Sequence, residues 1–224
     1  MTKVIQNSPE TTWIFDLDNT LYPEKCNLFS LIDLKMAEYL SNLLQVDRIE
    51  ARRVQKDYFV RYGTTLQGLI KVHNVDPEDF LNFVHDIDLS PLEENKELSA
   101  TLGSLQGRKF VFTNGDVPYA TRVLERLGIY HQMDGIFDIA KAGYIPKPNA
   151  RAYERFIGEY DINPLNAVMF EDMARNLIPA SNLGMTTVWV RTASEWAGID
   201  YQAEHIHYET EHIMDWFSAH LEEA

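Results

Sequence analysis

Hydrophobic and polar positions divide the chain into a strand, a long helical stretch and an alternation of strands and helices. Residues 11–17 form the short apolar run typical of a buried strand. From about residue 25 to residue 90, apolar positions recur at helical spacing, as in LFSLIDLKMAEYLSNLL and DPEDFLNFVHDI, with no strand pattern. The segment after Pro91 resembles a loop, and strands and helices alternate beyond it.

The alternating part predicts a sheet covered by helices. Apolar runs predict strands at 109–113, 135–138, 166–170 and 185–190. Capping and breaking residues predict helices from Asp116 and Pro118 to Gly128, from Asn149 to Tyr160, and from about 174 to 182. Alternating β and α elements with apolar strands indicate an α/β fold with a parallel sheet covered on both faces. The helical stretch is therefore an insertion after the first strand.

Composition narrows the class of partner. The chain has 224 residues, 45% of them hydrophobic, with 20 Lys and Arg against 34 Asp and Glu. The net charge of −14 argues against a nucleic-acid polymer or an anionic membrane as partner. A single cysteine, Cys26, excludes an internal disulfide, and no signal segment or membrane-spanning apolar run is present. We therefore expect a cytoplasmic protein.

Polar residues follow the predicted strands at their carboxyl ends, where ligands bind in parallel sheets. These residues are Asp16 and Asp18 after the first strand, Thr113, Asn114, Gly115 and Asp116 after the second, and Glu171 and Asp172 after the fourth. Lys147 lies just before the helix that Asn149 begins. All of them should converge on one rim of the sheet.

The acidic residues on this rim predict a metal-dependent phosphoryl transfer. Asp16 and Asp18 would repel each other if the strand continued, and a cation offsets that repulsion. With Asp172 they offer the hard oxygen ligands that suit Mg²⁺. A carboxylate at Asp16 can also attack phosphorus, and Asp18 can protonate the leaving oxygen and later deprotonate water.

The neutral and basic rim residues fit the same reaction. Thr113 and the backbone N–H groups of Asn114 and Gly115 are suited to hold phosphoryl oxygens. Lys147 is suited to neutralise charge on the nucleophile and on the transferring group. The expected ligand is therefore a small-molecule phosphate ester.

These motifs give the chain a family resemblance. DLDNT at residues 16–20, FTNG at 112–115, Lys147 in PKP and FEDMARN at 170–176 resemble, in order and spacing, the motifs of the haloacid dehalogenase superfamily of phosphotransferases. DNTLYP, YGTTLQGLIKVHNVD, FTNGD and KP resemble its pyrimidine 5′-nucleotidase branch, and the likeness extends from about Trp13 to Arg191. The resemblance implies a Rossmann-like core, residues 1–21 and 91–224, with a helical cap at 22–90.

The resemblance also implies roles for the rim residues. Asp16 becomes the nucleophile, and Asp18 the acid and base that also offers its backbone carbonyl to Mg²⁺. Thr113 and Lys147 stabilise the phosphate, and Asp172 is the third protein ligand of the metal.

Three further residues are implied outside the metal's immediate ligands. Glu171 stands where many relatives have Asp or Gly, and Asn176, at a position that is often acidic, would orient Lys147 or a metal-bound water. Thr20 completes this outer group.

Substrate choice should depend on the cap, since the core motifs recognise only phosphate. Arg61, Tyr62 and Gln67 in RYGTTLQGL are candidates to contact a base or sugar, because Arg and aromatic side chains stack on bases and Gln offers a donor and an acceptor. A helix-to-helix turn around Gly63 explains the same residues equally well. A pyrimidine preference rests on the resemblance alone.

Other residues that could carry chemistry favour structural interpretations. His205 and His207 have the spacing of a solvated strand face, and His73 and His85 that of a polar helix surface in the cap. Cys26 is interpreted as a small packing residue. The final segment EHIMDWFSAHL predicts one buried helix stripe.

We therefore expect a Mg²⁺-dependent phosphomonoesterase that hydrolyses nucleoside 5′-monophosphates through an aspartyl-phosphate. A sugar-phosphate phosphatase or a phosphoglucomutase-like enzyme is the alternative. Asp18 disfavours a haloacid dehalogenase, whose chemistry needs no acid for the leaving group. The joint presence of Asp16, Asp18, Lys147 and Asp172 disfavours an inactive nucleotide-binding protein. The oligomeric state stays open.

Overall fold

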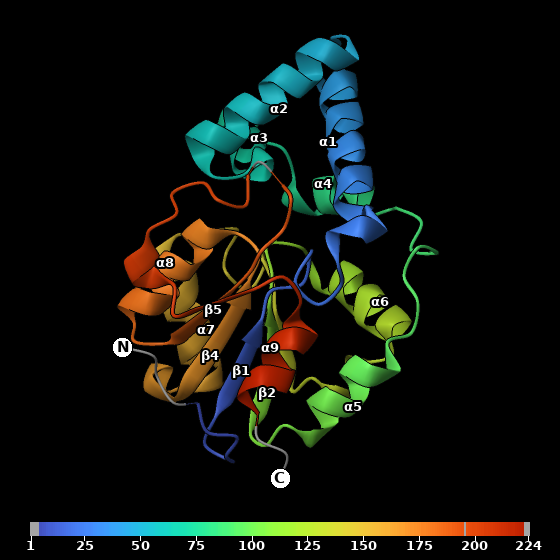
Figure 1. Cartoon of the computed structure of the whole chain (residues 1–224). Coiled ribbons are helices and arrows are strands. Elements are labelled where there is room, and N and C mark those ends of the chain that lie inside the picture. The colour runs from blue at the N-terminus through green and yellow to red at the C-terminus, as the bar shows by residue number, and fades with distance from the viewer. Residues whose placement is uncertain (1–4, 195, 222–224) are drawn as a thin grey trace.

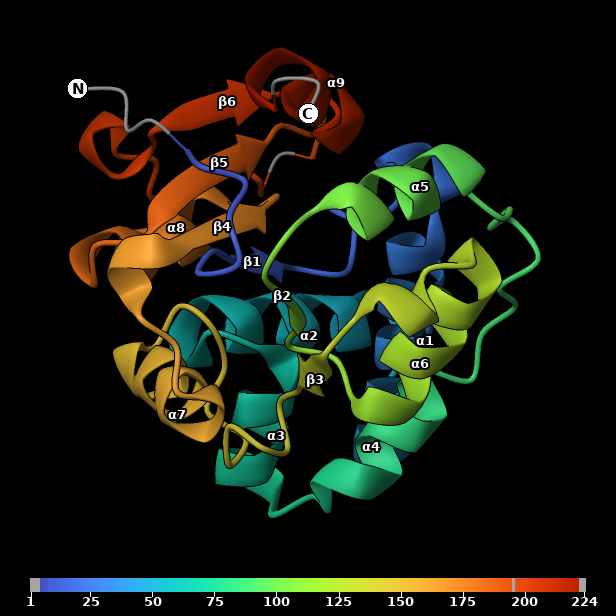
Figure 2. The same ribbon diagram turned by 90° about the horizontal axis from the view of Figure 1, so that it is seen from below.

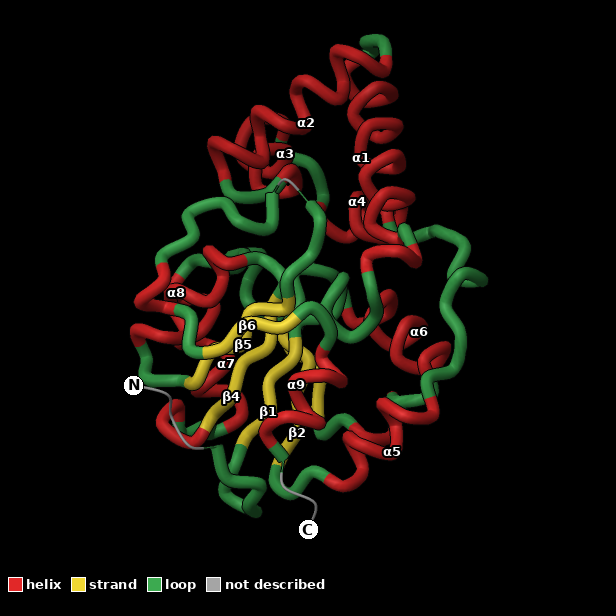
Figure 3. The backbone as a smooth tube through the Cα atoms, viewed as in Figure 1, coloured by secondary structure: helices red, strands yellow, loops and turns green. Residues whose placement is uncertain are grey.

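The protein is built on one parallel six-stranded sheet. The computed structural model describes residues 5–194 and 196–221. The strands lie in the order β3-β2-β1-β4-β5-β6 and are all parallel. They are the yellow segments in the lower half of Figure 3. Their bounds are β1 Thr12–Phe15, β2 Arg108–Phe112, β3 Gly135–Phe137, β4 Ala167–Glu171, β5 Thr186–Val190 and β6 Tyr208–Thr210. This is the α/β, Rossmann-like fold that the sequence predicts.

The central strand β1 separates two apolar cores. Trp13 and Phe15 pack into one buried cluster, whereas Ile14 packs into the other. Successive side chains of a strand point to opposite faces, so a fully apolar strand requires a covered sheet on both sides. All three side chains are 0% exposed.

Helices supply both covers. α5 (Lys96–Ser104), α6 (Val117–Leu127) and α9 (Ile213–His220) contribute to the cluster that contains Trp13, and α7 (Ala150–Tyr160) and α8 (Ala174–Asn182) to the cluster that contains Ile14. Figure 2 shows these two sets on opposite sides of the strands. The sheet is therefore the middle layer of three.

The segment between β1 and α5 forms a helical body above the sheet in Figure 1. It consists of α1 (Leu28–Leu44), α2 (Arg48–Tyr62), α3 (Thr65–His73) and α4 (Pro77–Val84). α1 packs against α2 and α4, and α2 packs against α3. Side-chain caps from Asp47, Thr64 and Asp76 begin the last three of these helices. The helical insertion is thus present, and its exact domain boundaries stay a prediction.

Among the described residues, hydrogen bonds join this helical body to the core. Arg122 donates to the carbonyl of His85 at 2.5 Å, and Arg175 donates to the carbonyl of Gly63 at 3.3 Å. The side-chain amide of Gln67 donates to the carbonyl of Tyr144. None of the helices among the described residues has both the length and the apolar character to cross a membrane.

The ends of α6 and α7 were predicted from the sequence, whereas helix α5 was not. Asp116 caps α6 and Gly128, at φ 74°, ends it, while Asn149 caps α7, as the sequence predicts. The loop expected after Pro91 is wrong in part, because α5 forms there with Asn95 as its cap. Its glycine and serines weaken the helical pattern, and burial of Leu98 and Leu102 stabilises it instead.

Candidate active site

Asp16 lies directly beyond β1, between the ends of β2 and β4. Its backbone N–H donates to the carbonyl of Phe170 on β4 at 2.9 Å, which continues the sheet pairing by one residue. The carboxylate is 7% exposed and accepts a hydrogen bond from the hydroxyl of Thr20 at 3.1 Å. Thr20 therefore orients Asp16, and its expected place outside the metal ligands stays a prediction.

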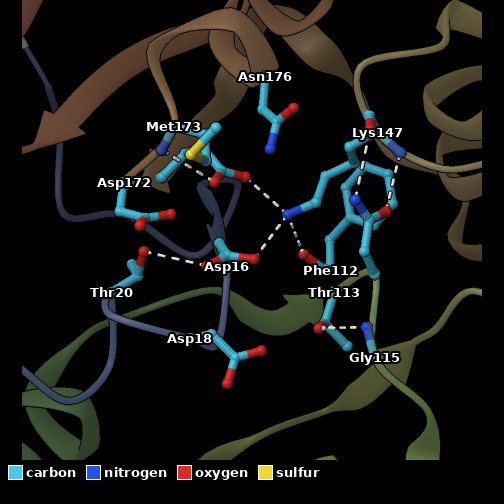
Figure 4. Close-up of polar contacts among 12 residues, drawn as sticks. Asp16, Asp18, Thr20, Phe112, Thr113, Gly115, Lys147, Asp172, Met173 and Asn176 are labelled. Carbon is cyan, nitrogen blue, oxygen red and sulfur yellow. Dashed lines mark hydrogen bonds and ion pairs between the residues drawn. The ribbon is translucent and has the colours of Figure 1, made fainter. Parts of the chain in front are cut away.

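Lys147 reaches Asp16 from the loop before α7. Its ammonium lies 2.7 Å from Asp16 Oδ1, 2.6 Å from Glu171 Oε2 and 2.8 Å from the carbonyl oxygen of Phe112 (Figure 4). The side chain is 1% exposed. Burial alone would lower the pKa of Lys147, but the charges of Asp16 and Glu171 outweigh it and hold that pKa above its ordinary value. Lys147 is therefore a permanent cation.

Three buried carboxylates meet beside this lysine. Oxygens of Asp16, Glu171 and Asp172 lie within 4.8 Å of one another. Burial, and then the charge of Glu171, raises the pKa of Asp16 to about 7, and burial with the same neighbour raises the pKa of Asp172 well above its usual range. Such shifts show that one lysine does not balance the cluster.

The cluster fits a divalent cation. Three carboxylates face one ammonium, so with all three ionised two negative charges would be uncompensated in a buried place. An all-oxygen set of this kind is chemically suited to Mg²⁺. Glu171 belongs to this set of carboxylates, although the sequence analysis places it outside the metal ligands. The carboxylate of Asp18 does not belong to the set. The expected contribution of Asp18 to the metal is its backbone carbonyl.

The Asp18 carboxylate is held by two tyrosines. Tyr22 and Tyr119 both donate to Asp18 Oδ1, at 2.5 and 2.7 Å, and their hydroxyls lie 3.3 Å apart. Burial and the charge of Asp18 raise the pKa of both tyrosines, which keeps them protonated as donors. Because both bonds use Oδ1, the second oxygen of Asp18 is left for proton exchange. The sequence analysis missed Tyr119, since α6 brings it close only in the fold.

The loop after β2 is ordered by its own hydrogen bonds. The N–H of Gly115 donates to Thr113 Oγ1 at 2.9 Å, and the Asn114 side chain accepts from the N–H of Lys147 at 2.8 Å and donates to its carbonyl at 3.3 Å. Asn114 therefore ties the loop to the segment that carries Lys147. A Cβ at position 115 would lie 3.3 Å from both Thr113 Oγ1 and Tyr119, so glycine keeps this approach open.

Asn176 completes the buried part of the site from α8. Its carbonyl accepts a hydrogen bond from the hydroxyl of Tyr153, whereas its side-chain oxygen has no donor among the described residues. Figure 4 places the side chain on the same side of the cluster as Lys147. The expected orienting contact between Asn176 and Lys147 is not among the hydrogen bonds of the described residues. The Lys147 ammonium donates to Asp16, to Glu171 and to the carbonyl of Phe112 instead.

A cavity of about 400 Å³ lies between the rim and the helical body. The cavity continues onto α1, α2 and the segment that contains Trp196. On the core side its lining includes the residues at the strand ends and their neighbours, namely Asp16, Asp18, Thr113, Asn114, Gly115, Lys147, Glu171, Asp172 and Asn176. This volume is in the range of small-molecule sites. The fold thus places the carboxylates at one end of a cavity and the insertion at the other.

The three candidate substrate residues are not brought to this cavity. Arg61 is 67% exposed and pairs with Asp57 at 2.8 Å, while Tyr62 packs edge-to-face on Tyr58. Gln67 bonds the core carbonyl of Tyr144. They lie beside the turn at Gly63. Other residues line the cavity instead, among them Gln55 and Phe59 on a different face of α2. The sequence does not show which face of α2 points inward.

The interpretation of His85 as a surface residue is wrong. It is 6% exposed, stacks on Tyr119 with ring centroids 4.4 Å apart, and places Nδ1 3.2 Å from Asp116 Oδ2. His85 also lines the cavity. A histidine at a helix end can be buried against another element, which periodicity within α4 does not reveal. His73 is half-buried and lies 2.6 Å from the hydroxyl of Tyr58.

The solvated strand face at His205 and His207 is also wrong. His205 ends a short 3-10 helix (Ala203–His205), and β6 begins only after His207. His207 Nδ1 lies 2.7 Å from Thr187 Oγ1 on β5, so it anchors the edge strand. Cys26 packs, half-buried, against the apolar core, in agreement with its expected role.

Comparison with known proteins identifies the family of this chain. The model of the haloacid dehalogenase-like hydrolases matches residues 11–184. Phosphate metabolism protein 8 of Saccharomyces cerevisiae is 29% identical over 191 residues, which is 77% of this chain and 59% of the yeast protein. The chain therefore spans less than two thirds of that relative.

Solved structures share the fold. A HAD phosphatase from Thermococcus onnurineus superposes with a TM-score of 0.64 at 21% identity, over 93% of this chain and 97% of that one. The putative HAD-hydrolase YfnB of Bacillus subtilis, bound to magnesium, gives 0.59 at 13% identity, over 98% and 100%. L-2-haloacid dehalogenase from Xanthobacter autotrophicus gives 0.54 at 14%, over 95% and 99%. At these identities the likeness establishes the fold alone.

Proposed function

Because the chain belongs to the haloacid dehalogenase-like hydrolases, we propose that it is a Mg²⁺-dependent phosphomonoesterase acting on nucleoside 5′-monophosphates. The observation that carries the proposal is the pairing of two carboxylates with different surroundings in one cavity. Asp16 lies against a buried ammonium, whereas Asp18 is held by two neutral hydroxyls. Different environments suit one carboxylate to attack and the other to proton transfer.

The first step breaks the ester bond. A carboxylate oxygen of Asp16 attacks phosphorus, the bond between phosphorus and the ester oxygen breaks, and the leaving alkoxide takes a proton from Asp18. The product on the chain is an aspartyl-phosphate. Thr113 and the backbone N–H of Asn114 hold phosphoryl oxygens, and Lys147 offsets their charge. The N–H of Gly115, expected to join them, donates to Thr113 Oγ1 instead.

The second step restores the enzyme. Asp18, now ionised, takes a proton from water, the water oxygen attacks phosphorus, and the bond to Asp16 breaks to release inorganic phosphate. Asp16, Glu171 and Asp172, with the backbone carbonyl of Asp18, would hold Mg²⁺. When bound, Mg²⁺ would offset charge on the nucleophile and on the transferring group.

Two observations support a phosphate ester over a halogenated acid. Carbon–halogen cleavage releases a halide that needs no proton, so a positioned Asp18 would have no task there. Four cationic side chains, Arg52, Lys56, Lys147 and Arg175, line the cavity of a chain whose net charge is −14. Six carboxylates line the cavity as well, but Lys56 and Arg175 are in no ion pair among the described residues, and these two cations suit a dianion. The name of the yeast relative also refers to phosphate.

A substrate panel tests the proposal. Purified protein should release phosphate from 4-nitrophenyl phosphate and from UMP or CMP faster than from AMP, GMP or ribose 5-phosphate, with Mg²⁺ present. The Asp16→Asn variant is the matched control, because the amide is nearly isosteric and a poor nucleophile. Turnover of ribose 5-phosphate above all nucleotides would favour the sugar-phosphate alternative. No turnover of any ester, with release of halide from 2-chloropropionate, would refute a phosphatase.

A further inference from the structure

Gln55 on α2 presents a buried acceptor that no described residue satisfies. The residue is 5% exposed and lines the cavity. Its Nε2 donates to Asp33 Oδ1 at 2.7 Å, but Oε1 has no hydrogen-bond donor within the described ranges 5–194 and 196–221. Buried polar atoms without partners are rare because leaving one unpaired is unfavourable. An acceptor in a cavity wall therefore indicates a donor on the ligand.

The orientation of this amide is fixed by its neighbours. The carboxylate of Asp33 only accepts hydrogen bonds, so the NH₂ group of Gln55 must face it. Arg52 holds the other carboxylate oxygen of Asp33 at 2.7 Å, which keeps that side chain in place. Flipping the amide would bring two acceptors together. Gln55 therefore offers the cavity an acceptor and not a donor.

Two aromatic rings line the same cavity beside Gln55. Phe59, four residues further on α2 and so on the same helix face, meets Trp196 edge-to-face with ring centroids 5.5 Å apart. The guanidinium of Arg175 lies 4.5 Å from the Phe59 ring centroid, which holds the ring in place. Flat apolar walls next to a single acceptor suit a planar ring that carries an N–H at its edge.

We propose that Gln55 is a specificity-determining residue that accepts a hydrogen bond from an N–H of the substrate's base, with Phe59 and Trp196 as the wall for its ring. An imide N–H, such as N3–H of uracil, fits this acceptor. The inference rests on the proposed function, since it takes the phosphate to lie at Asp16 in the same cavity. A ribose hydroxyl is the other chemical source of a donor, and the aromatic wall favours the base.

Binding to a chain that cannot turn over tests the inference. In the Asp16→Asn background with Mg²⁺, calorimetry compares UMP with 3-methyluridine 5′-monophosphate, in which a methyl group replaces the donor hydrogen. UMP should bind about tenfold more tightly, and Gln55→Met should remove most of that ratio, because the acceptor is lost while the side chain keeps its length. If Gln55→Met does not fold, the affinities of UMP and 3-methyluridine 5′-monophosphate for the chain that keeps Gln55 still test whether the base donates a hydrogen bond.

Gln67→Met is the matched control, because Gln67 is also a cap glutamine but lies outside the cavity lining. It should leave the ratio of the two affinities within twofold. A ratio that falls with Gln67→Met and not with Gln55→Met would overturn the inference, as would equal binding of the two nucleotides to the chain with Gln55. If ribose 5-phosphate lost as much affinity as UMP in Gln55→Met, the donor would be a sugar hydroxyl and the assignment to the base would be wrong.

Failure of the proposed function is visible separately. It would appear as absent phosphate release by the chain with Asp16, whatever the affinities. The binding ratio does not depend on turnover, so the two results decide different claims.

Discussion

Replacing Lys147 with methionine should destabilise the protein more than any surface lysine change. Methionine keeps much of the aliphatic length and removes the ammonium that contacts Asp16, Glu171 and the carbonyl of Phe112 at 2.6–2.8 Å. The site is 1% exposed, so bulk water cannot take the ammonium's place. Two buried carboxylates would then face each other without a cation.

The expected loss in the free energy of unfolding is about 3–5 kcal/mol at pH 8 in chelator, the usual cost of removing one partner from a buried ion pair. Protonation of a carboxyl group limits that cost. Since the pKa of Asp16 is already raised to about 7, the loss should shrink on acidification, by at most about 1.4 kcal/mol per pH unit. Mg²⁺ should also reduce the loss, because it supplies positive charge to the same carboxylates.

Urea unfolding followed by tryptophan fluorescence measures the effect. With a slope of about 2–3 kcal/mol per M, the midpoint should fall by roughly 1–2.5 M. Lys141→Met is the matched control, because Lys141 is an exposed lysine whose ammonium donates to the Tyr160 hydroxyl at 2.9 Å, and its change should cost less than about 0.5 kcal/mol. Equal midpoints for the two variants in chelator would refute the view that Lys147 compensates the buried carboxylates.

The remaining predictions concern the carboxylates and the metal. Asp16→Asn should abolish phosphate release and prevent trapping of labelled phosphate on the chain, and full activity would rule the nucleophile out. In chelator, the wild type should lose stability relative to Asp16→Asn as pH rises from about 4 to about 7, because the raised pKa makes the folded state bind more protons than the unfolded state in that window; urea unfolding at both ends checks this, and a constant difference contradicts it. Activity should disappear with chelator and return with Mg²⁺ but poorly with Ca²⁺, which takes looser coordination; an undiminished rate after chelation and dialysis would remove the metal assignment. Asp18→Asn should slow a nucleoside 5′-monophosphate by about 10²-fold or more and the phosphorylation step of an aryl phosphate less, so rapid-mixing kinetics should give a burst of aryl alcohol; equal slowing without a burst would leave Asp18 a structural role only.

The rim of the sheet was predictable because its chemistry is local in sequence. The functional carboxylates and Thr113 there follow a strand, Lys147 precedes a helix, and parallel strands carry their carboxyl ends to one edge. The apolar run before Asp16 and the capping residue Asn149 after Lys147 each mark such a position. Once the alternation of strands and helices is recognised, the meeting of Asp16, Lys147 and Asp172 follows without knowledge of any contact.

The far side of the cavity was not predictable in the same way. Arg61, Tyr62 and Gln67 looked suitable by residue type, yet the packing of α2 against α1 and α3 turns Gln55 and Phe59 inward. The pattern on α2 is weak because charged residues occupy most of its positions. Orientation was therefore set by neighbouring helices and not by the helix itself.

By itself, the sequence determined the parallel sheet, the helical insertion and the residues at the strand ends, because strand and helix periodicity and capping depend on neighbours a few residues away. Only the tertiary structure decided that Tyr119 and Tyr22 hold Asp18, that Glu171 joins the buried acidic cluster and that, among the described residues, Gln55 has an unpaired acceptor in the cavity. Those contacts join residues as far apart in the sequence as Asp16 and Glu171, and they depend on how whole elements pack, which no local pattern encodes.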